Sequence, residues 1–305
     1  MGGSLSLTQA HQEIRSVNRL ALGTVQFGLP YGIANKGGQV SRAEAKSMLE
    51  LVLANGVDTL DTAIAYGDSE TCLGEFGTHG FKVITKLPTL PDNCADIAAW
   101  VQQELSASLS RLGATAVYGL LLHRSEQLLG SDGALLYQAL QTLKDKGQVQ
   151  KVGISIYSPS ELIALTPHYD FDLVQAPFNL VDRRFHATGW MQRLKDDGVE
   201  VHTRSAFLQG MLLMERADVP VEFSHWSDLW DRWHQWLSEH DVSAVQACLT
   251  FPLSFPEIDR VIVGADSTKQ LLQIFHAADS QCFQGSPNLQ CEDENLINPA
   301  LWSKL

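Results

Sequence analysis

Short apolar segments alternate with helix-forming segments eight times along the 305 residues of this chain, and no other feature limits the fold as much. The apolar segments have no regular polar interruption, which is typical of parallel strands buried on both faces. Eight strand–helix repeats in one chain indicate a (β/α)8 barrel. We therefore predict an α/β fold, a (β/α)8 TIM barrel in a single domain. The predicted strands are 19–24, 59–61, 81–86, 118–123, 151–155, 173–176, 199–204 and 260–263.

Helix-forming segments with recognisable ends separate these strands. Ser41 and Glu44 form a capping box that begins one helix, Pro159 lies in the first turn of another, and Gly147 ends a third. The predicted helices are 41–55, 69–76, 96–112, 135–146, 159–165, 189–197, 227–239, 243–253 and 267–278. A doubly wound open sheet is the alternative fold. It would carry a Gly-x-Gly-x-x-Gly turn after its first strand, and this chain has none there.

Polar segments stand at both ends of the predicted domain, which spans residues 1–305. Residues 1–18 form an N-terminal extension, which is either a short helix or a lid over the barrel floor. Residues 279–305 form a C-terminal tail, and Leu301 and Trp302 are the candidates for anchoring it to the body.

Polar side chains stand at the carboxyl ends of six predicted strands. They are Asp61, Lys86, His123, Ser155, Gln175 and Arg204. In a (β/α)8 barrel these strand ends line one mouth, where active sites lie. A single aspartate after a strand most often only caps the next helix, so Asp61 alone would indicate little. Tyr66, beside Gly67, adds another titratable group just after Asp61, and together these residues predict a site at the mouth.

The net charge argues against nucleic acid and anionic membranes as partners, and the cysteines indicate a reducing compartment. The formal net charge of −13 argues against an anionic membrane surface and against nucleic acid, whose binding proteins carry a basic surface. A local cluster of Lys or Arg could still hold phosphates. No apolar stretch of about 18 residues could span a bilayer, and the five scattered cysteines are typical of reduced thiols in the cytoplasm.

The strand ends carry no His-x-His pair and no clustered carboxylates, so we predict no metal.

Four short motifs at these strand ends resemble those of the aldo-keto reductases. They are Asp61-Thr62-Ala63-x-x-Tyr66-Gly67, Thr85-Lys86, Leu121-Leu122-His123 and Gly153-Ile154-Ser155. The resemblance extends from about residue 20 to about residue 278. It implies that the catalytic residues are Asp61, Tyr66, Lys86 and His123.

The resemblance also implies a nicotinamide cofactor. Family precedent gives NADP(H), with NAD(H) as the alternative. Ser155 and Gln175 match residues that hold the nicotinamide carboxamide, 205–213 match the loop around the pyrophosphate, and 264–273 match the segment at the adenosine end. The glycine-rich loop 23–32 either permits close backbone approach to a ligand or is a plain flexible loop. The predicted cofactor-binding residues are Gly23, Thr24, Ser155, Gln175, Arg204, Ser205, Phe207, Gln209, Gly210, Gly264, Asp266, Ser267, Lys269 and Gln273.

Three positions depart from the family's pattern. Ile156 stands where an Asn commonly follows Ser155. Arg204 stands where many members have an aromatic ring that stacks on the nicotinamide, although a planar guanidinium also stacks. Asp266 lies in the segment where many members grip the 2′-phosphate of NADP with a basic residue. It would repel a phosphate, and Lys269 is the cation nearest to it in this segment.

The implied reaction is hydride transfer between nicotinamide and the carbonyl of an aldehyde, a ketone or a sugar, with Tyr66 as proton donor. Free tyrosine has a pKa of about 10, so we expect the ammonium of Lys86 to lower it. Asp61 would pair with Lys86, and His123 would orient the substrate oxygen. A nucleotide-binding sensor or regulatory subunit with little turnover, as in the potassium-channel beta subunits, is the alternative function.

The predicted partner is a small-molecule carbonyl substrate, and the sequence carries no indication of an oligomeric state. Aromatic and arginine side chains in the loops and the tail are the candidates for the substrate pocket. They are Phe27, Tyr31, Arg124, Phe178, Arg183, Arg184 and Trp226.

Overall fold

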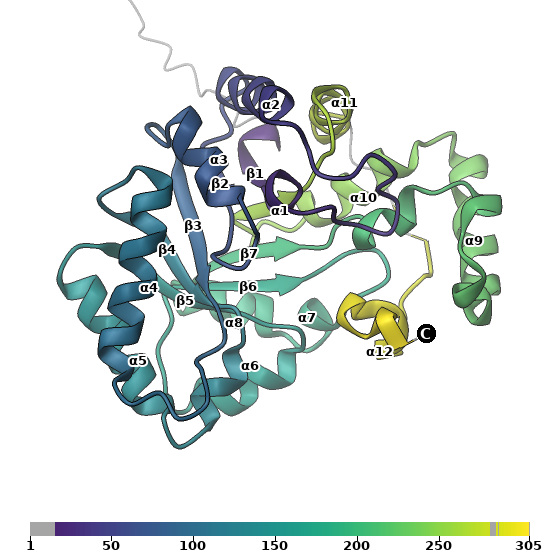
Figure 1. The fold of residues 1–305 in the computed structure, drawn as a ribbon. Helices are drawn as coiled ribbons and strands as arrows, with labels where there is room; N and C mark the ends of the chain where they lie inside the picture. Colours follow the sequence, from purple (N-terminus) through teal and green to yellow (C-terminus); the bar gives the residue numbers. More distant parts are fainter. Residues whose placement is uncertain (1–15, 281–284, 286, 305) are drawn as a thin grey trace, which may run out of the picture.

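Eight parallel strands close into a barrel at the centre of the molecule (Figure 1). The computed structural model describes residues 16–280, 285 and 287–304. The strands are β1 Leu20–Gly23, β2 Thr59–Asp61, β3 Lys82–Leu87, β4 Val117–Leu122, β5 Val149–Ser155, β6 Leu173–Pro177, β7 Glu200–Arg204 and β8 Arg260–Val263. The strand order follows the chain, and β1 pairs with β8 to close the barrel. The predicted (β/α)8 barrel is therefore confirmed.

Helices surround the barrel and connect its strands (Figure 1). The α-helices are α1 Val25–Gly28, α2 Arg42–Ala54, α3 Ser69–Phe76, α4 Ile97–Leu112, α5 Gly133–Asp145, α6 Pro159–Leu165, α7 Arg184–Ala187, α8 Trp190–Asp196, α9 Ser227–His240, α10 Ala244–Leu253, α11 Thr268–Ala278 and α12 Glu294–Ile297. The 3-10 helices are η1 Ser16–Arg19, η2 Ser125–Leu129, η3 Leu208–Leu213, η4 Arg216–Asp218, η5 Val221–Trp226 and η6 Pro299–Lys304. The short helices α1, α7 and α12 are absent from the predicted set because four residues are too few to show a helical period.

Local sequence explains where the longer helices begin. The Ser41 hydroxyl accepts a hydrogen bond from the Glu44 amide at the start of α2. At the start of α6, Ser158 and Glu161 form a reciprocal capping box, and Pro159 occupies the first turn. These contacts satisfy amide groups that have no partner inside the helix, so each helix starts at a defined distance from the strand before it.

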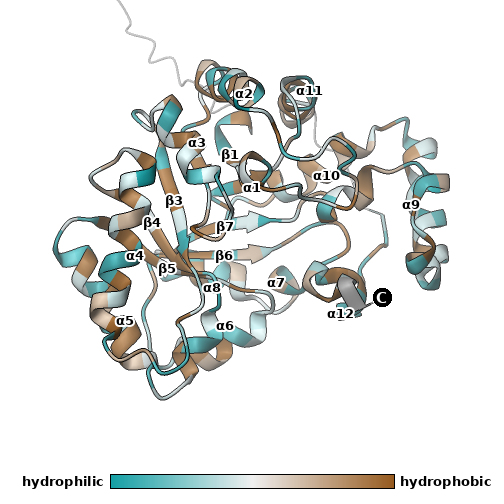
Figure 2. Cartoon of the chain, viewed as in Figure 1, coloured by the Kyte–Doolittle hydropathy of each residue, from teal (hydrophilic) through white to brown (hydrophobic). Residues whose placement is uncertain are grey.

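Apolar burial holds the helices against the barrel. On α4, Val101, Leu105 and Leu112 are fully buried, and they lie on one face at helical spacing. Figure 2 shows hydrophobic colour over β3, β4 and β5 and mixed colour over the surrounding helices. Each buried side chain of this size stabilises the fold by about 1.5–3 kcal/mol. The barrel sheet is therefore covered by apolar helix faces.

The interior of the barrel is packed with side chains. Ile84, Leu121 and Leu173, from β3, β4 and β6, are fully buried and form their own cluster. The register that pairs Ser155 with Gln175 brings the polar ends of the strands to one level. Gln175 is the third residue of the five in β6, so it does not end its strand as predicted. The staggered register still carries it to the mouth.

The two ends of the described chain pack on the barrel body. Val17 is fully buried, and its amide donates to Asp279 at 3.4 Å. Residues 1–15 of the predicted extension lie outside the described residues, as do 281–284, 286 and 305 of the tail. The Trp302 ring packs edge-on against Phe223, with 4.9 Å between ring centroids. Among the described residues, no helix is both long and apolar enough to cross a membrane.

Candidate active site

A buried ion pair forms the floor of the mouth. The Lys86 ammonium donates to an Asp61 carboxylate oxygen at 2.7 Å and to the Thr62 carbonyl at 2.8 Å. Lys86 is only 1% exposed, so it meets these partners away from water. Asp61 ends β2, Lys86 lies one residue before the end of β3, and these strands are neighbours. The adjacency of the strands therefore creates the pair.

The second oxygen of Asp61 is held from the far side of the barrel. The side-chain amide nitrogen of Gln175 donates to this oxygen at 2.7 Å. The Ser155 hydroxyl donates to the side-chain oxygen of Gln175 at 3.2 Å. Four strands thus contribute to one chain of hydrogen bonds, from Ser155 to Lys86. Because both Asp61 oxygens are satisfied, the buried carboxylate has a fixed orientation.

Tyr66 and His123 lie over this floor. Their ring centroids are 5.8 Å apart at an interplanar angle of 82°, and the Lys86 nitrogen is 5.2 Å from the Tyr66 ring centroid. The turn that carries Tyr66 packs directly on Gly28, where a β-carbon would come within 1.7 Å of the Tyr66 carbonyl oxygen. Any larger residue at Gly28 would displace the turn. The structure therefore brings the four predicted catalytic side chains together.

Burial and charge set the protonation of these groups. Burial, and then the charge of Asp61, raise the pKa of Tyr66 above its ordinary 10. The sequence analysis expected Lys86 to lower this pKa, and that expectation is wrong. The net shift is upward because desolvation of the phenolate and the charge of Asp61 outweigh the opposing charge of Arg204. Burial, and then the charges of Lys86 and Arg204, lower the pKa of His123 to about 4. At neutral pH, Tyr66 is a phenol and His123 is a neutral imidazole.

Burial lowers the pKa of Lys86 from its ordinary value, and the charge of Asp61 opposes this shift. The ion pair with Asp61 and the Thr62 carbonyl bond both favour the charged ammonium. Lys86 therefore remains the cation beneath Tyr66.

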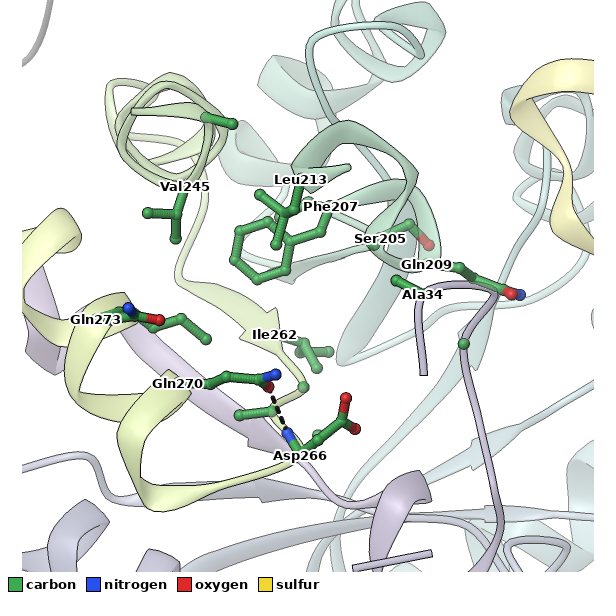
Figure 3. A pocket seen from close by; sticks show the side chains of 18 of the residues that line it. Ala34, Ser205, Phe207, Gln209, Leu213, Val245, Ile262, Asp266, Gln270 and Gln273 are labelled. Atoms are coloured by element: carbon green, nitrogen blue, oxygen red, sulfur yellow. Dashed lines mark hydrogen bonds between the residues drawn. The ribbon is translucent and has the colours of Figure 1, made fainter. Parts of the chain in front are cut away.

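A cavity of about 1400 Å³ extends from this floor. It is larger than the roughly 300–1,000 Å³ that encloses a drug-sized ligand. Its far part lies between the loops after β7 and β8, where Phe207, Leu213, Val245 and Ile262 face Asp266 and Gln270 (Figure 3). The predicted cofactor residues that line it are Gly23, Thr24, Ser155, Gln175, Arg204, Ser205, Phe207, Gln209, Gly210, Gly264, Asp266 and Gln273.

Two predicted cofactor residues do not line the cavity. The Ser267 hydroxyl accepts from the Gln270 amide as the N-cap of α11. Lys269 is exposed on the first turn of that helix. The exposure of Lys269 and its position outside the cavity lining could not be read from the sequence.

The cavity lining fits an elongated ligand held largely by neutral polar groups. The Gln26 side-chain oxygen is buried, lines the cavity and has no hydrogen-bond partner among the described residues. Gly264 packs closely on the Gln26 side chain. A β-carbon added at position 264 would lie 2.4 Å from the side-chain nitrogen of Gln26. Ser205 and Gln209 adopt positive φ angles of 64° and 52° in the loop after β7. Strained backbone of this kind costs about 1–3 kcal/mol per residue and clusters at ligand sites.

The sequence analysis missed two cavity residues, Asn35 and Tyr157, and one contact beside the cavity, made by Glu44. Asn35, in the loop after β1, donates to Asp266 at 3.2 Å and joins the first and last loops of the barrel. Tyr157 lies two residues past β5, and its ring supports Arg204 at 4.6 Å. The Glu44 carboxylate accepts from the Thr268 amide at the N-terminus of α11 at 2.5 Å. Proximity to a strand end could have indicated Tyr157, but nothing in the sequence linked Glu44 to residue 268.

Only one of the predicted substrate-pocket residues, Tyr31, lines the cavity among the described residues. Phe27 and Phe178 are fully buried and pack in the core. Arg184 pairs with Asp182 at 2.9 Å. The remaining candidates, Arg124, Arg183 and Trp226, do not line the cavity either.

Comparisons with known proteins agree with this geometry. The sequence model of the Aldo/keto reductase family matches residues 19–284. The aldo-keto reductase AKR11C1 from Bacillus halodurans, in its holo form, superposes with a TM-score of 0.70 at 19% identity, over 87% of this chain and 88% of that chain. Its apo form gives 0.64 at 19% identity, over 88% of each chain. An aldo-keto reductase from Pseudomonas aeruginosa gives 0.63 at 22% identity, over 86% of this chain and 89% of that chain.

No curated protein sequence matches the chain. The solved structures, at such low identities, show the fold alone, whereas the family match covers most of the sequence, including the segments that carry the site. The chain therefore belongs to the aldo/keto reductase family.

Proposed function

We propose that this protein is an NAD(P)(H)-dependent oxidoreductase that interconverts a carbonyl compound and an alcohol, with Tyr66 as proton donor. The observation that carries the proposal is the grouping of Tyr66 and His123 over the Lys86–Asp61 ion pair at one end of a long cavity. Family membership supports the general class of reaction.

The nicotinamide cofactor, when bound, supplies or accepts the hydride. Residues of this chain that would hold it are those lining the cavity, with Ser155 and Gln175 near the reacting end and Gly264, Asp266 and Gln273 near the other. The unpaired Gln26 oxygen and the strained loop after β7 support such a ligand. We propose both NADP(H) and NAD(H) as cofactors, with NADP(H) favoured by family precedent.

Tyr66 donates its hydroxyl proton to the carbonyl oxygen as that oxygen gains negative charge. Its raised pKa keeps the proton available at neutral pH. The charges of Lys86 and Arg204 then stabilise the phenolate that remains. Neutral His123 donates a hydrogen bond from its ring N–H to the same oxygen and so orients the substrate. Positioned proton transfer of this kind contributes about 10²–10⁴-fold to a rate.

The test is nicotinamide absorbance with NADPH and NADH against a panel of aldehydes, ketones and sugars. We expect consumption of the reduced nucleotide, dependent on both carbonyl and enzyme. Tight nucleotide binding with no turnover on any carbonyl would contradict the enzyme and favour the nucleotide-binding sensor. Failure to bind either nucleotide would contradict both.

A further inference from the structure

One cation in the cavity has no acidic partner. Arg204 ends β7 and lines the same cavity as Tyr66 and His123. Its guanidinium lies over the Tyr157 ring and donates to the Ile156 carbonyl at 2.9 Å and the Ser205 hydroxyl at 3.3 Å. All three partners are neutral. Within residues 16–280, 285 and 287–304, no carboxylate forms an ion pair with Arg204.

The absence of an ion-pair partner for Arg204 among the described residues is not explained by a shortage of carboxylates in the chain. The chain has 35 acidic and 22 basic residues. Six other arginines of the described chain lie within ion-pair distance of carboxylates; they are Arg42, Arg111, Arg184, Arg193, Arg216 and Arg260. Arg19, which is bound to backbone carbonyls, lies outside the cavity. A guanidinium that is partly removed from water without a counter-charge is unfavourable. In a protein this acidic, leaving it uncompensated inside a cavity indicates that the counter-charge comes with a ligand.

A second arginine approaches the same aromatic ring. The Arg124 guanidinium lies 5.5 Å from the Tyr157 ring centroid, and the Arg204 guanidinium lies 4.6 Å from it. Arg124 directly follows His123 and is exposed. None of the ion pairs among the described residues involves it. Two like charges against one ring repel each other, and an anion between or beside them would relieve that repulsion.

The ring that both arginines contact is held in place by its backbone. The Tyr157 amide donates to a Glu161 oxygen at 2.7 Å, and Arg184 donates to the Tyr157 carbonyl at 3.1 Å. Arg184 is itself fixed by its ion pair with Asp182. The Tyr157 ring is therefore a preorganised platform, and a guanidinium stacked on it keeps its remaining N–H groups free for a planar anion.

Arg204 belongs to the reacting end of the cavity and not to the end assigned to the adenosine. It contributes to the pKa shifts of Tyr66, Lys86 and His123, whereas burial and Gln270 set the pKa of Asp266. An anion bound by Arg204 therefore lies close to the carbonyl that Tyr66 protonates.

We propose that Arg204, stacked on Tyr157 and assisted by Arg124, is an anion subsite of the substrate pocket, and that the substrate is a carbonyl compound bearing a carboxylate or a phosphate. This inference rests on the proposed carbonyl chemistry at Tyr66. It makes Arg204 a specificity residue for the substrate, in place of a partner for the nicotinamide ring.

The first test compares carbonyl substrates with and without an anionic group. One pair is 4-carboxybenzaldehyde and 4-carbamoylbenzaldehyde, which match in shape; the other is glyceraldehyde 3-phosphate and glyceraldehyde. We expect wild-type kcat/KM to favour the anionic member of at least one pair by about tenfold or more, the value of one hydrogen bond to a charged group. The pair that shows the preference identifies whether the anion is a carboxylate or a phosphate. Equal values within both pairs would overturn the proposal.

The second test removes the charge. The measured quantity is the kcat/KM of the anionic substrate divided by that of its neutral counterpart. We expect Arg204→Gln to lower this ratio to near one, whatever the variant does to the absolute rates. Arg124→Gln should lower the ratio partly. Arg193→Gln is the matched control, because the Arg193 guanidinium also lies 4.6 Å from an aromatic ring, that of Trp190, but outside the cavity. It should leave the ratio at the wild-type value.

Two further results distinguish an anion subsite from a cofactor-binding role of Arg204 and from failure of the proposed function. If Arg204→Gln weakens nucleotide binding in a fluorescence titration and leaves the ratio unchanged, Arg204 serves the cofactor and the proposal fails. If wild-type protein turns over no carbonyl, the proposed function fails. The subsite is then tested by calorimetry of 4-carboxybenzyl alcohol against 4-carbamoylbenzyl alcohol in the presence of saturating nucleotide. Equal affinities, or a preference that survives Arg204→Gln, would overturn it.

Discussion

The proposed chemistry depends on one hydroxyl group, that of Tyr66. This hydroxyl makes no hydrogen bond to any described residue, while the ring contacts His123 and Lys86. Its removal should therefore affect the reaction much more than the fold.

We expect Tyr66→Phe to lower kcat by about 10²–10⁴-fold, because the carbonyl oxygen loses its proton donor. The free energy of unfolding should change by less than about 0.5 kcal/mol, and nucleotide affinity should stay at the wild-type value. Steady-state kinetics, urea unfolding and a fluorescence titration measure the three quantities. A kcat near that of the wild type with any carbonyl substrate would exclude Tyr66 as the donor.

Lys86 and Asp61 act as one buried unit. Lys86→Met leaves the Asp61 carboxylate buried with Gln175 and without a cation. Breaking a buried pair in this way costs about 3–5 kcal/mol, so we expect that loss in urea unfolding together with a large loss of turnover. The double variant Asp61→Asn with Lys86→Met should recover most of the stability and none of the turnover. Unfolding of the single variant at the wild-type midpoint would show that the pair does not support the fold.

At the scale of elements, the loop between β8 and α11 is the place where we propose that a 2′-phosphate would bind. Asp266 lines the cavity and accepts from Asn35, and Glu44 accepts from the Thr268 amide at the start of α11. In this proposed binding mode, the 2′-phosphate would meet the Asp266 carboxylate in the cavity, with Glu44 beside the cavity, where it would need cations. Lys269, the cation closest in sequence, is exposed outside the cavity lining.

We therefore expect NADPH to bind better than NADH by less than about a hundredfold, a gap of ~3 kcal/mol. Asp266→Arg should raise NADPH affinity about tenfold or more, since it adds hydrogen bonds to a charged group, and should leave NADH affinity nearly unchanged. Fluorescence titration of both nucleotides measures this, with Lys269→Gln as the control that should change neither. A thousandfold wild-type preference for NADPH would mean that other residues hold the phosphate.

At the scale of the whole molecule, the buried site links folding stability to pH. The pKa of His123 is about 4 in the folded protein, below its ordinary 6.5. The unfolded chain therefore binds more protons between these values, and the free energy of unfolding falls as pH drops from about 6.5 to about 4. Above this window His123 is neutral in both states and has no effect on the slope.

His123→Gln should make this pH dependence shallower. We measure urea unfolding at several pH values across this window, from about 6.5 to about 4. We expect the free energy of unfolding to fall more steeply for wild type than for the variant. The Glu200 carboxylate also has a lowered pKa, chiefly through its bond with His202, but it is present in both proteins and cancels in the comparison. Parallel curves would show that His123 is not desolvated in the folded state.

The sequence by itself determined the barrel, most helix boundaries and the strands that carry the polar residues. The reason is that burial on both faces and helix capping are local patterns, written in consecutive residues. The prediction that Asp61, Lys86 and His123 share one mouth follows from parallel strand order alone. Their catalytic roles remain predictions that the experiments above test.

Only the tertiary structure decided which side chains meet across the mouth. These features include the bond from Gln175 to Asp61, the link from Asn35 to Asp266 and the position of Lys269 outside the cavity. They depend on how segments distant in sequence are placed in the fold. The direction of the Tyr66 pKa shift was mispredicted because burial of the phenol, the largest cause of the shift, is a property of the folded molecule. The unpaired charge of Arg204 is likewise visible only in the fold, since a missing partner cannot be read from neighbours along the chain.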